Sequence, residues 1–345
     1  MIGAKAMAQS RGKVSLIRQL SEVTQITMTW IREKVLRDDY DDLTPMIEHA
    51  LTSTVPDSDR AIMVKLGCEL KGEDWHEALP AMAAWELLNI NLLVTDDFFD
   101  RRTTSRMGEK TISQKWGEET CLVLGFVLTS IANEALISAW SKSSKWSLHD
   151  ALEILTWATK WEYYSQFQES QLVKIPLSET TLEIYIDLIK NSTAVGIAGS
   201  FELGCVMGRG NKKERENFRD FGMDLGCLLQ IRDDLIDYIY NENLIKKGPF
   251  NDLLTKKKRL PLLAAYWEGT SLEKKQIEKI LRKKILTLKD ALVITEMITS
   301  QKVEKRIQNI TDKIAHSAKE KLHRLPEIQP AKLRLSELIE LFAEL

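Results

Sequence analysis

Apolar residues recur at spacings of three and four along most of this 345-residue chain. That period matches the turn of an α-helix, and the alternating pattern and tight Asn-Gly or Asp-Gly turns of β-hairpins are absent from the sequence. Three helix-start signals, at Ser147, Thr180 and Thr270, agree with this interpretation. The pattern predicts an all-α protein with helices at Val14–Leu36, His76–Phe99, Glu118–Trp140, Leu148–Gln168, Thr181–Met207, Glu214–Tyr240 and Ile277–Leu322.

The segments between these helices are short, and no linker rich in Pro, Gly or Ser divides the chain. Hydrophobic residues make up 44% and charged residues 28%, which is typical of a globular protein and excludes wholesale disorder. We therefore expect a single multi-helix domain over residues 1–345, in which residues 1–40 contribute an N-terminal helix. The net charge of −2 gives no basic surface for nucleic-acid binding.

The cysteines indicate a reducing compartment. None of the four forms a CxxC pair and there are only five histidines, so neither a zinc site nor a disulfide scaffold is indicated. The first residues also lack the apolar core of a signal peptide. We expect reduced, buried thiols in a cytoplasmic protein. The expected thiols are Cys68, Cys121, Cys205 and Cys227.

One segment, from Cys121 to Trp140, is long and apolar enough to be considered as a membrane span. It contains Thr129, Asn133 and Glu134, which are costly in a lipid bilayer. We interpret it as a buried core helix and predict no membrane span.

Two acidic motifs of the form DDxxD each close a strongly apolar helix. Residues i and i+4 share a face of a helix, so the first and last carboxylates of each motif point the same way. Such like charges repel, and burying them costs free energy, unless a divalent cation lies between them. The motifs comprise Asp96, Asp97 and Asp100, then Asp233, Asp234 and Asp237.

Ligands that are all carboxylates favour a hard cation, so Mg²⁺ is the expected metal. Because Mg²⁺ commonly shares its coordination sphere with phosphate oxygens, the motifs suggest a diphosphate substrate. A single DDxxD is more often a solvated helix end. Two of them, each after an apolar helix, indicate a site, and we predict all six aspartates as metal ligands and catalytic residues.

Basic residues that suit a diphosphate follow each motif. Arg101, Arg102 and Arg106 come after the first, and Lys247 and the run from Lys256 to Arg259 come after the second. Each of these could equally belong to a solvated loop. Lys190 stands alone in an apolar stretch and either snorkels to solvent or enters a polar cavity, the interpretation we favour. Gln230 lies one turn before the second motif.

These residues resemble the trans-isoprenyl diphosphate synthases, or polyprenyl synthases. The likeness runs from about Arg60 to the C-terminus and depends on four segments. They read EALPAMAAWELLNINLLVTDDFFD, RMGEKTISQKWGEE, FGMDLGCLLQIRDDLIDY and KGPFNDLLTKKKRLPLLAA. The resemblance implies the isoprenoid synthase (class I terpenoid synthase) fold, a bundle of helices around a central cavity. It also implies homodimers.

The resemblance assigns roles to matching positions. The six aspartates would bind Mg²⁺, with three ions expected beside an allylic diphosphate. Chain length in the family depends on residues just before the first motif, here Asn91 and Leu92. Asn91 could bond to its own helix or steer a cation. Contacts to the substrate would come from Lys190, Arg101, Arg102, Arg106, Gln168, Gln230, Lys247 and Lys258.

The sequence also departs from the family pattern. The segment Val55–Arg60 stands where a Gly-Gly-Lys-Arg type motif binds isopentenyl diphosphate, and only Arg60 is retained. Aspartates in this segment would repel a diphosphate. Gln171 and Phe126 stand where the family usually has aspartates. Met107 stands where the family has an arginine, and Arg101 and Arg102 could compensate for its loss.

Three functions remain open from the sequence. The first is Mg²⁺-dependent transfer of an allylic prenyl group to isopentenyl diphosphate, which would give a C15 to C20 prenyl diphosphate. The second uses the same site as a terpene cyclase, or as a prenyltransferase with another acceptor, which would explain the altered isopentenyl motif. The third is a regulatory subunit of an active synthase, which six retained carboxylates argue against.

Overall fold

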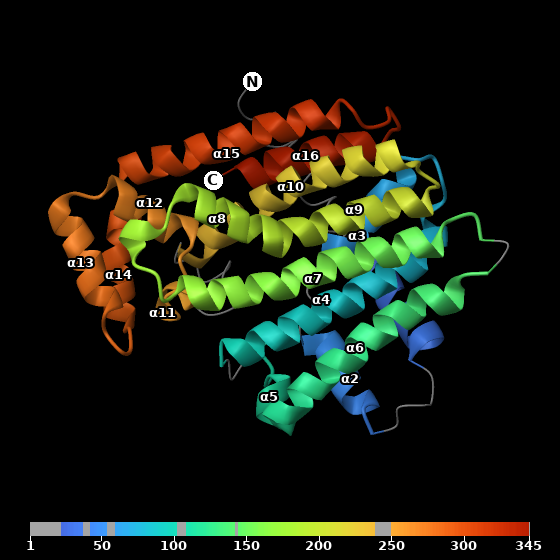
Figure 1. Ribbon diagram of the computed structural model, residues 1–345, viewed down its shortest axis with the longest axis horizontal. Helices are drawn as coiled ribbons and strands as arrows, with labels where there is room; N and C mark the ends of the chain where they lie inside the picture. Colours follow the sequence, from blue (N-terminus) through green and yellow to red (C-terminus); the bar gives the residue numbers. More distant parts are fainter. Residues whose placement is uncertain are drawn as a thin grey trace. The chain divides into compact units, whose positions relative to one another are not determined.

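The computed structural model describes residues 22–36, 42–53, 59–101, 108–141, 144–238 and 250–344, and Figure 1 shows its helices in sequence colours. The chain forms two compact units, which are described separately below. The first unit comprises residues 1–159, 196–222 and 324–337, and the second comprises residues 160–195, 223–323 and 338–345.

The predicted all-α fold is confirmed, because every regular element in the described residues is a helix. The N-terminal helix is seen from residue 22 to residue 35, and its predicted beginning lies outside the described residues. The longer elements are α2 (Thr44–Ser53), α3 (Asp59–Glu69), α4 (Leu79–Phe99), α6 (Glu118–Ala139), α7 (Leu148–Leu172), α8 (Leu182–Ile189), α9 (Val195–Met207), α10 (Lys212–Tyr238), α12 (Leu260–Glu268), α13 (Ser271–Leu281), α14 (Leu288–Ile298), α15 (Gln301–Leu322) and α16 (Ala331–Ala343).

Helix α4 is the centre of the first unit. Its start is favoured by Pro80 at the first turn, and almost every residue from Ala81 to Leu92 is buried, as expected of a helix that is apolar on all sides. It packs against α3 and lies beside α6 (Figure 1). In the same unit α3 and α9 approach so closely at Gly67 and Gly204 that a Cβ on Gly204 would lie 2.2 Å from the Val64 carbonyl oxygen.

Helix α6 buries only one of its faces. This corrects the expectation from the sequence that it is a buried core helix. Leu124, Leu128 and Ala135 are fully buried, whereas Phe126 is 76% exposed. Two segments in the described residues are long and apolar enough to cross a membrane by length and composition. They are Trp75–Phe99, whose most apolar part is 83% buried, and Glu118–Ala139, with 44% buried.

The core of the second unit forms around α12, which packs against α14 and α15. The sequence pattern predicted one helix from Ile277 to Leu322, but the structure has three there, α13, α14 and α15. The break before α14 has a local cause, because Thr287 and Asp290 form a reciprocal capping box at its first turn. The predicted capping box at Thr270 is confirmed at the start of α13.

The predicted helix from Thr181 to Met207 is interrupted by a π-helical turn, η5 (Lys190–Ala194). The N-cap of α8 is Thr181, one residue later than predicted. The Thr181 side chain accepts a hydrogen bond from the backbone nitrogen of Ile184. A π-helical turn adds a residue to the helix and often marks a functional site. All four cysteines are free and buried, as predicted.

Candidate active site

The first aspartate-rich motif occupies the last turn of α4, in the first unit. The Asp100 backbone nitrogen donates to the Asp96 carbonyl at 2.9 Å, so the helix continues to the end of the motif. Asp97 is 3% exposed, whereas Asp96 and Asp100 are half-buried. The first and last carboxylates are therefore the more accessible pair of this motif. Arg101 follows immediately, is exposed, and has a left-handed φ of 53°.

The second motif, near the end of α10 in the second unit, repeats this pattern. Asp233 is exposed, Asp237 is half-buried and Asp234 is 1% exposed. Asp237 Oδ2 accepts from the Asp252 backbone nitrogen at 2.9 Å. In each motif, the second carboxylate faces the protein and the first and last are nearer to solvent.

The buried Asp234 is held by several donors. Its Oδ2 accepts from the Tyr185 hydroxyl at 2.7 Å and lies 3.4 Å from the Leu260 backbone nitrogen, at the first turn of α12. Its Oδ1 accepts from Gln230 Nε2 at 2.6 Å. Burial raises the pKa of Asp234 to about 6, even though the positive charge of Arg259 acts in the opposite direction.

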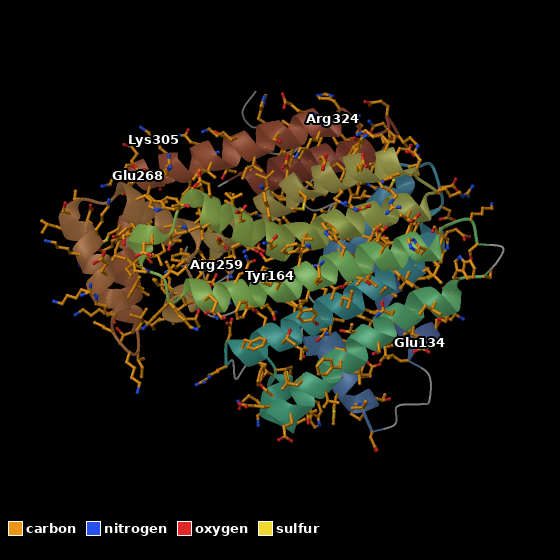
Figure 2. The ribbon with its side chains drawn as sticks, viewed as in Figure 1. Glu134, Tyr164, Arg259, Glu268, Lys305 and Arg324 are labelled. Carbon is orange, nitrogen blue, oxygen red and sulfur yellow. The ribbon has the colours of Figure 1, made fainter. Side chains whose placement is uncertain are left out.

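Arg259 lies among three carboxylates of the second unit. Its Nη2 is 2.7 Å from Glu169 Oε1, and its Nε is 3.4 Å from Asp252 and 3.7 Å from Asp234. Its side chain is only 12% exposed. Figure 2 labels Arg259 among the side chains of the protein. Burial alone would lower the pKa of Arg259, but the three carboxylates outweigh burial and raise it.

Lys257 and Lys258, next to Arg259 in the chain, are also engaged within the protein. Lys257 pairs with Glu169 at 3.0 Å. Lys258 donates to the carbonyl oxygens of Leu172, at 2.6 Å, and Ile175, where α7 ends. Burial lowers the pKa of Lys258 to about 8. Within the run that the sequence suggested for diphosphate, Lys258 thus caps α7, while Lys257 and Arg259 neutralise carboxylates. The contact of Lys258 with substrate stays a prediction.

Polar residues of η5 connect α7 with α10 inside the second unit. Asn191 Nδ2 donates to Gln168 Oε1 at 3.0 Å, and the Thr193 hydroxyl donates to Gln230. Gln168 and Gln230, both predicted from the sequence, are therefore each held by a residue of η5, and Gln230 in turn donates to Asp234. Lys190 is exposed at the start of η5.

Asn91 has a role that neither sequence interpretation foresaw. Its Nδ2 donates to the Gly125 carbonyl at 2.7 Å and to Thr129 Oγ1 at 2.8 Å, which connects α4 to α6. A Cβ on Gly125 would lie 2.7 Å from Asn91 Oδ1, so a larger residue at this position would displace the Asn91 side chain. Leu92, the other residue that the resemblance relates to chain length, is 8% exposed.

Three predicted substrate-binding residues, Arg102, Arg106 and Lys247, lie outside the described residues. The sequence interpretation missed Glu169 and Tyr185, whose partners in the second unit are distant in sequence. It included Arg259 only as part of a basic run that suits a diphosphate, and it did not foresee the carboxylates that Arg259 contacts.

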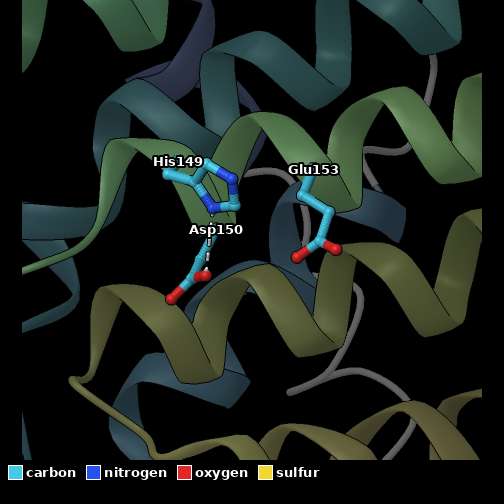
Figure 3. A group of neighbouring side chains, drawn as sticks. All are labelled: His149, Asp150 and Glu153. Atoms are coloured by element: carbon cyan, nitrogen blue, oxygen red, sulfur yellow. Dashed lines mark ion pairs between the residues drawn. The ribbon is translucent and has the colours of Figure 1, made fainter.

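A separate group of possible metal ligands on α7 consists of His149, Asp150 and Glu153 (Figure 3). Arg215 already occupies it, with its Nη1 3.0 Å from Asp150 and its Nη2 3.4 Å from Glu153. The group is largely solvent-exposed and has a protein cation in place. It therefore gives no reason to place a metal there.

Comparison with known proteins gives consistent results. A family model described as polyprenyl synthetase matches residues 47–298. A short chain isoprenyl diphosphate synthase from Methanocaldococcus jannaschii is 30% identical over 62% of this chain and 64% of its own length. A geranylgeranyl diphosphate synthase from Saccharolobus solfataricus is 28% identical over 77% of this chain and 79% of its own length.

Solved structures show the same fold at low identity. A polyprenyl synthase from Caulobacter crescentus, described as complexed with calcium and isoprenyl diphosphate, has a TM-score of 0.83 at 22% identity. That similarity covers 96% of this chain and 97% of the other. A geranylgeranyl pyrophosphate synthase has a TM-score of 0.84 at 17% identity, covering 94% and 98%. At these identities the likeness concerns the fold alone.

Proposed function

Since the chain belongs to the polyprenyl synthetase family, we propose that it transfers an allylic prenyl group to isopentenyl diphosphate. The observation that carries this proposal is the repeated pattern of the two motifs. In each, two carboxylates one helix turn apart stand nearer to solvent than the buried one between them. The relatives named as geranylgeranyl and farnesyl diphosphate synthases support a product of C15 to C20.

The first and last carboxylates of each motif, which are more accessible than the second, fit a hard divalent cation. Asp96 with Asp100, and Asp233 with Asp237, offer only oxygen ligands, which is the donor set that Mg²⁺ prefers. Bound there with diphosphate oxygens, Mg²⁺ would neutralise the charge that develops on the leaving group.

The remaining steps belong to side chains of the chain itself. Lys190 and Arg101, both exposed, would pair with diphosphate oxygens as the carbon–oxygen bond of the allylic substrate breaks. Gln168, fixed by Asn191, would orient the substrate. The double bond of isopentenyl diphosphate then attacks the allylic cation, and the new carbon–carbon bond is followed by loss of one proton. The released diphosphate is a suitable acceptor for that proton.

A second candidate is cyclisation, or transfer to another acceptor, and one sequence feature favours it. Arg60, in α3, is preceded by Asp57 and Asp59 where the resembled family has neutral or basic residues. Carboxylates at that point disfavour a second diphosphate. Under this alternative the same metal-binding carboxylates ionise the allylic substrate, and isopentenyl diphosphate is not consumed.

We also propose that the protein is a cytoplasmic homodimer. Its four cysteines are free and buried, which suits a reducing compartment. Helix α6 exposes an apolar stripe, defined as Leu122, Val123, Phe126 and Ile137, that a second copy of the chain would cover.

The test is incubation of the protein and Mg²⁺ with geranyl, farnesyl or geranylgeranyl diphosphate, each with and without isopentenyl diphosphate. Extracted hydrocarbons and phosphatase-treated products are both analysed. A longer prenyl alcohol that forms only with isopentenyl diphosphate supports the proposed transfer. A hydrocarbon or alcohol formed from the allylic substrate alone supports cyclisation and contradicts the primary proposal.

A further inference from the structure

Asp234 is enclosed on both carboxylate oxygens. Tyr185 and the Leu260 backbone nitrogen approach Oδ2, Gln230 donates to Oδ1, and no part of the side chain is exposed. The Asp234 carboxylate faces the N-terminus of α12, where the helix dipole also favours a negative charge. These contacts tie α8, α10 and α12 together at one point.

Arg259 extends this cluster to two further elements. It pairs with Glu169 of α7 and lies 3.4 Å from Asp252 of α11 (Asn251–Leu254). Lys257 adds a second positive charge beside Glu169. Three carboxylates and two cations thus form a compact cluster, and most of each side chain is removed from water.

The cluster also reaches the accessible carboxylates of the second motif. The backbone nitrogen of Asp252 donates to Asp237 Oδ2, while the Asp252 side chain faces Arg259. Asp233 and Asp234 are consecutive on α10, so fixing the rotation of α10 through Asp234 fixes the direction of Asp233 as well. The direction of each accessible carboxylate therefore depends on the charge cluster behind it.

We propose that Arg259, with Asp234 and Glu169, is a positioning residue that orients Asp233 and Asp237 for Mg²⁺. This inference rests on the proposed function and gives Asp234 a different role from the metal ligand predicted by its motif. Supporting groups behind metal ligands typically contribute 10- to 100-fold to metal affinity. An arginine is suited to this task because its planar fork contacts several carboxylates at fixed angles, which a lysine does not reproduce.

The experiment measures Mg²⁺ binding by calorimetry in the presence of inorganic diphosphate, using the full chain. Arg259→Lys keeps the charge and removes the fork, and Glu169→Gln removes a partner that is 19% exposed. We expect each to weaken Mg²⁺ binding by about 10- to 100-fold. Asp234→Asn should fall in the same range and should not add to Arg259→Lys, because the two residues act through one contact.

The first unit provides a matched control. Arg215 has the same 12% side-chain exposure as Arg259 and also contacts three carboxylates, Asp150, Glu153 and Glu202. Arg215→Lys should therefore lower thermal stability to a similar extent and leave Mg²⁺ binding unchanged. Circular dichroism and the melting temperature of each variant establish that it is folded at the temperature of the titration.

Several results would overturn the inference. It is wrong if Arg259→Lys and Glu169→Gln bind Mg²⁺ as the wild type does, or if Arg215→Lys weakens binding equally. It is also wrong if Asp234→Asn loses binding as completely as Asp233→Asn while Arg259→Lys binds normally, because Asp234 would then be a ligand. If Arg259→Lys fails to fold, the milder Glu169→Gln decides. Wild-type protein that binds Mg²⁺ and diphosphate without making a prenyl product contradicts the proposed function only.

Discussion

The Tyr185 hydroxyl donates a 2.7 Å hydrogen bond to Asp234, and both side chains are buried. A neighbouring helix thus decides which carboxylate of an aspartate-rich motif faces the protein. Replacing Tyr185 with Phe leaves the buried carboxylate with one donor fewer. We expect a loss of about 1.5–3 kcal/mol in the free energy of unfolding, measured by urea denaturation. Tyr164→Phe, at a 46% exposed tyrosine, should change it little.

The contact between Asn91 and Gly125 makes a second prediction. Gly125→Ala would place a Cβ 2.7 Å from Asn91 Oδ1, and the resulting overpacking should cost about 1–3 kcal/mol of stability. In the double variant with Asn91→Ala the steric cost should largely disappear, so the two effects on the melting temperature should not add. Simple addition of the two losses would show that the residues do not interact.

The carboxylates of the first motif should differ in how much they contribute to Mg²⁺ binding. Asp96 is half-buried and Asp97 is 3% exposed. Asp96→Asn should weaken Mg²⁺-dependent diphosphate binding by more than the 10- to 100-fold typical of a supporting residue, whereas Asp97→Asn should stay within about that range. Calorimetric titration of both variants checks the order, and equal losses would contradict it.

Lys258 predicts a dependence of stability on alkaline pH. Its pKa in the folded protein is about 8, below the ordinary value of 10.5, because the ammonium is buried. Between these values the unfolded chain binds more protons at this site, so its contribution to stability rises with pH. The melting temperature of the wild type minus that of Lys258→Met should therefore increase from pH 7 to pH 10. A difference that stays constant or decreases would show that the ammonium is not buried as described.

The apolar stripe of α6 predicts a specific effect on assembly. Phe126→Glu places a charge at a 76% exposed phenylalanine of the stripe and should convert the proposed dimer to a monomer, measured by light scattering after size exclusion. Leu292→Glu, at a leucine of α14 that is 51% exposed, is the matched control and should leave assembly unchanged. A dimer that survives Phe126→Glu would exclude the stripe as its interface.

The helices and the motifs could be predicted from the amino-acid sequence, because both depend on local spacing. The 3.6-residue period indicated α4 and α10, and the same period set the first and last carboxylates of DDxxD on one side. It could not separate α13, α14 and α15, since their apolar residues continue through the breaks. The capping box of Thr287 with Asp290 carried a local signal that was overlooked.

The contacts of the charged and polar residues near the motifs could not be predicted in this way, because they depend on the tertiary structure. Arg259 and Lys258 are neighbours in the chain and both are basic, yet one pairs with carboxylates and the other caps α7. The Asn91 side chain donates hydrogen bonds to Gly125 and Thr129 of α6, and not to its own helix as one sequence interpretation suggested. These outcomes depend on partners that are distant in sequence, and a buried charge is tolerated only where the fold brings such partners to it.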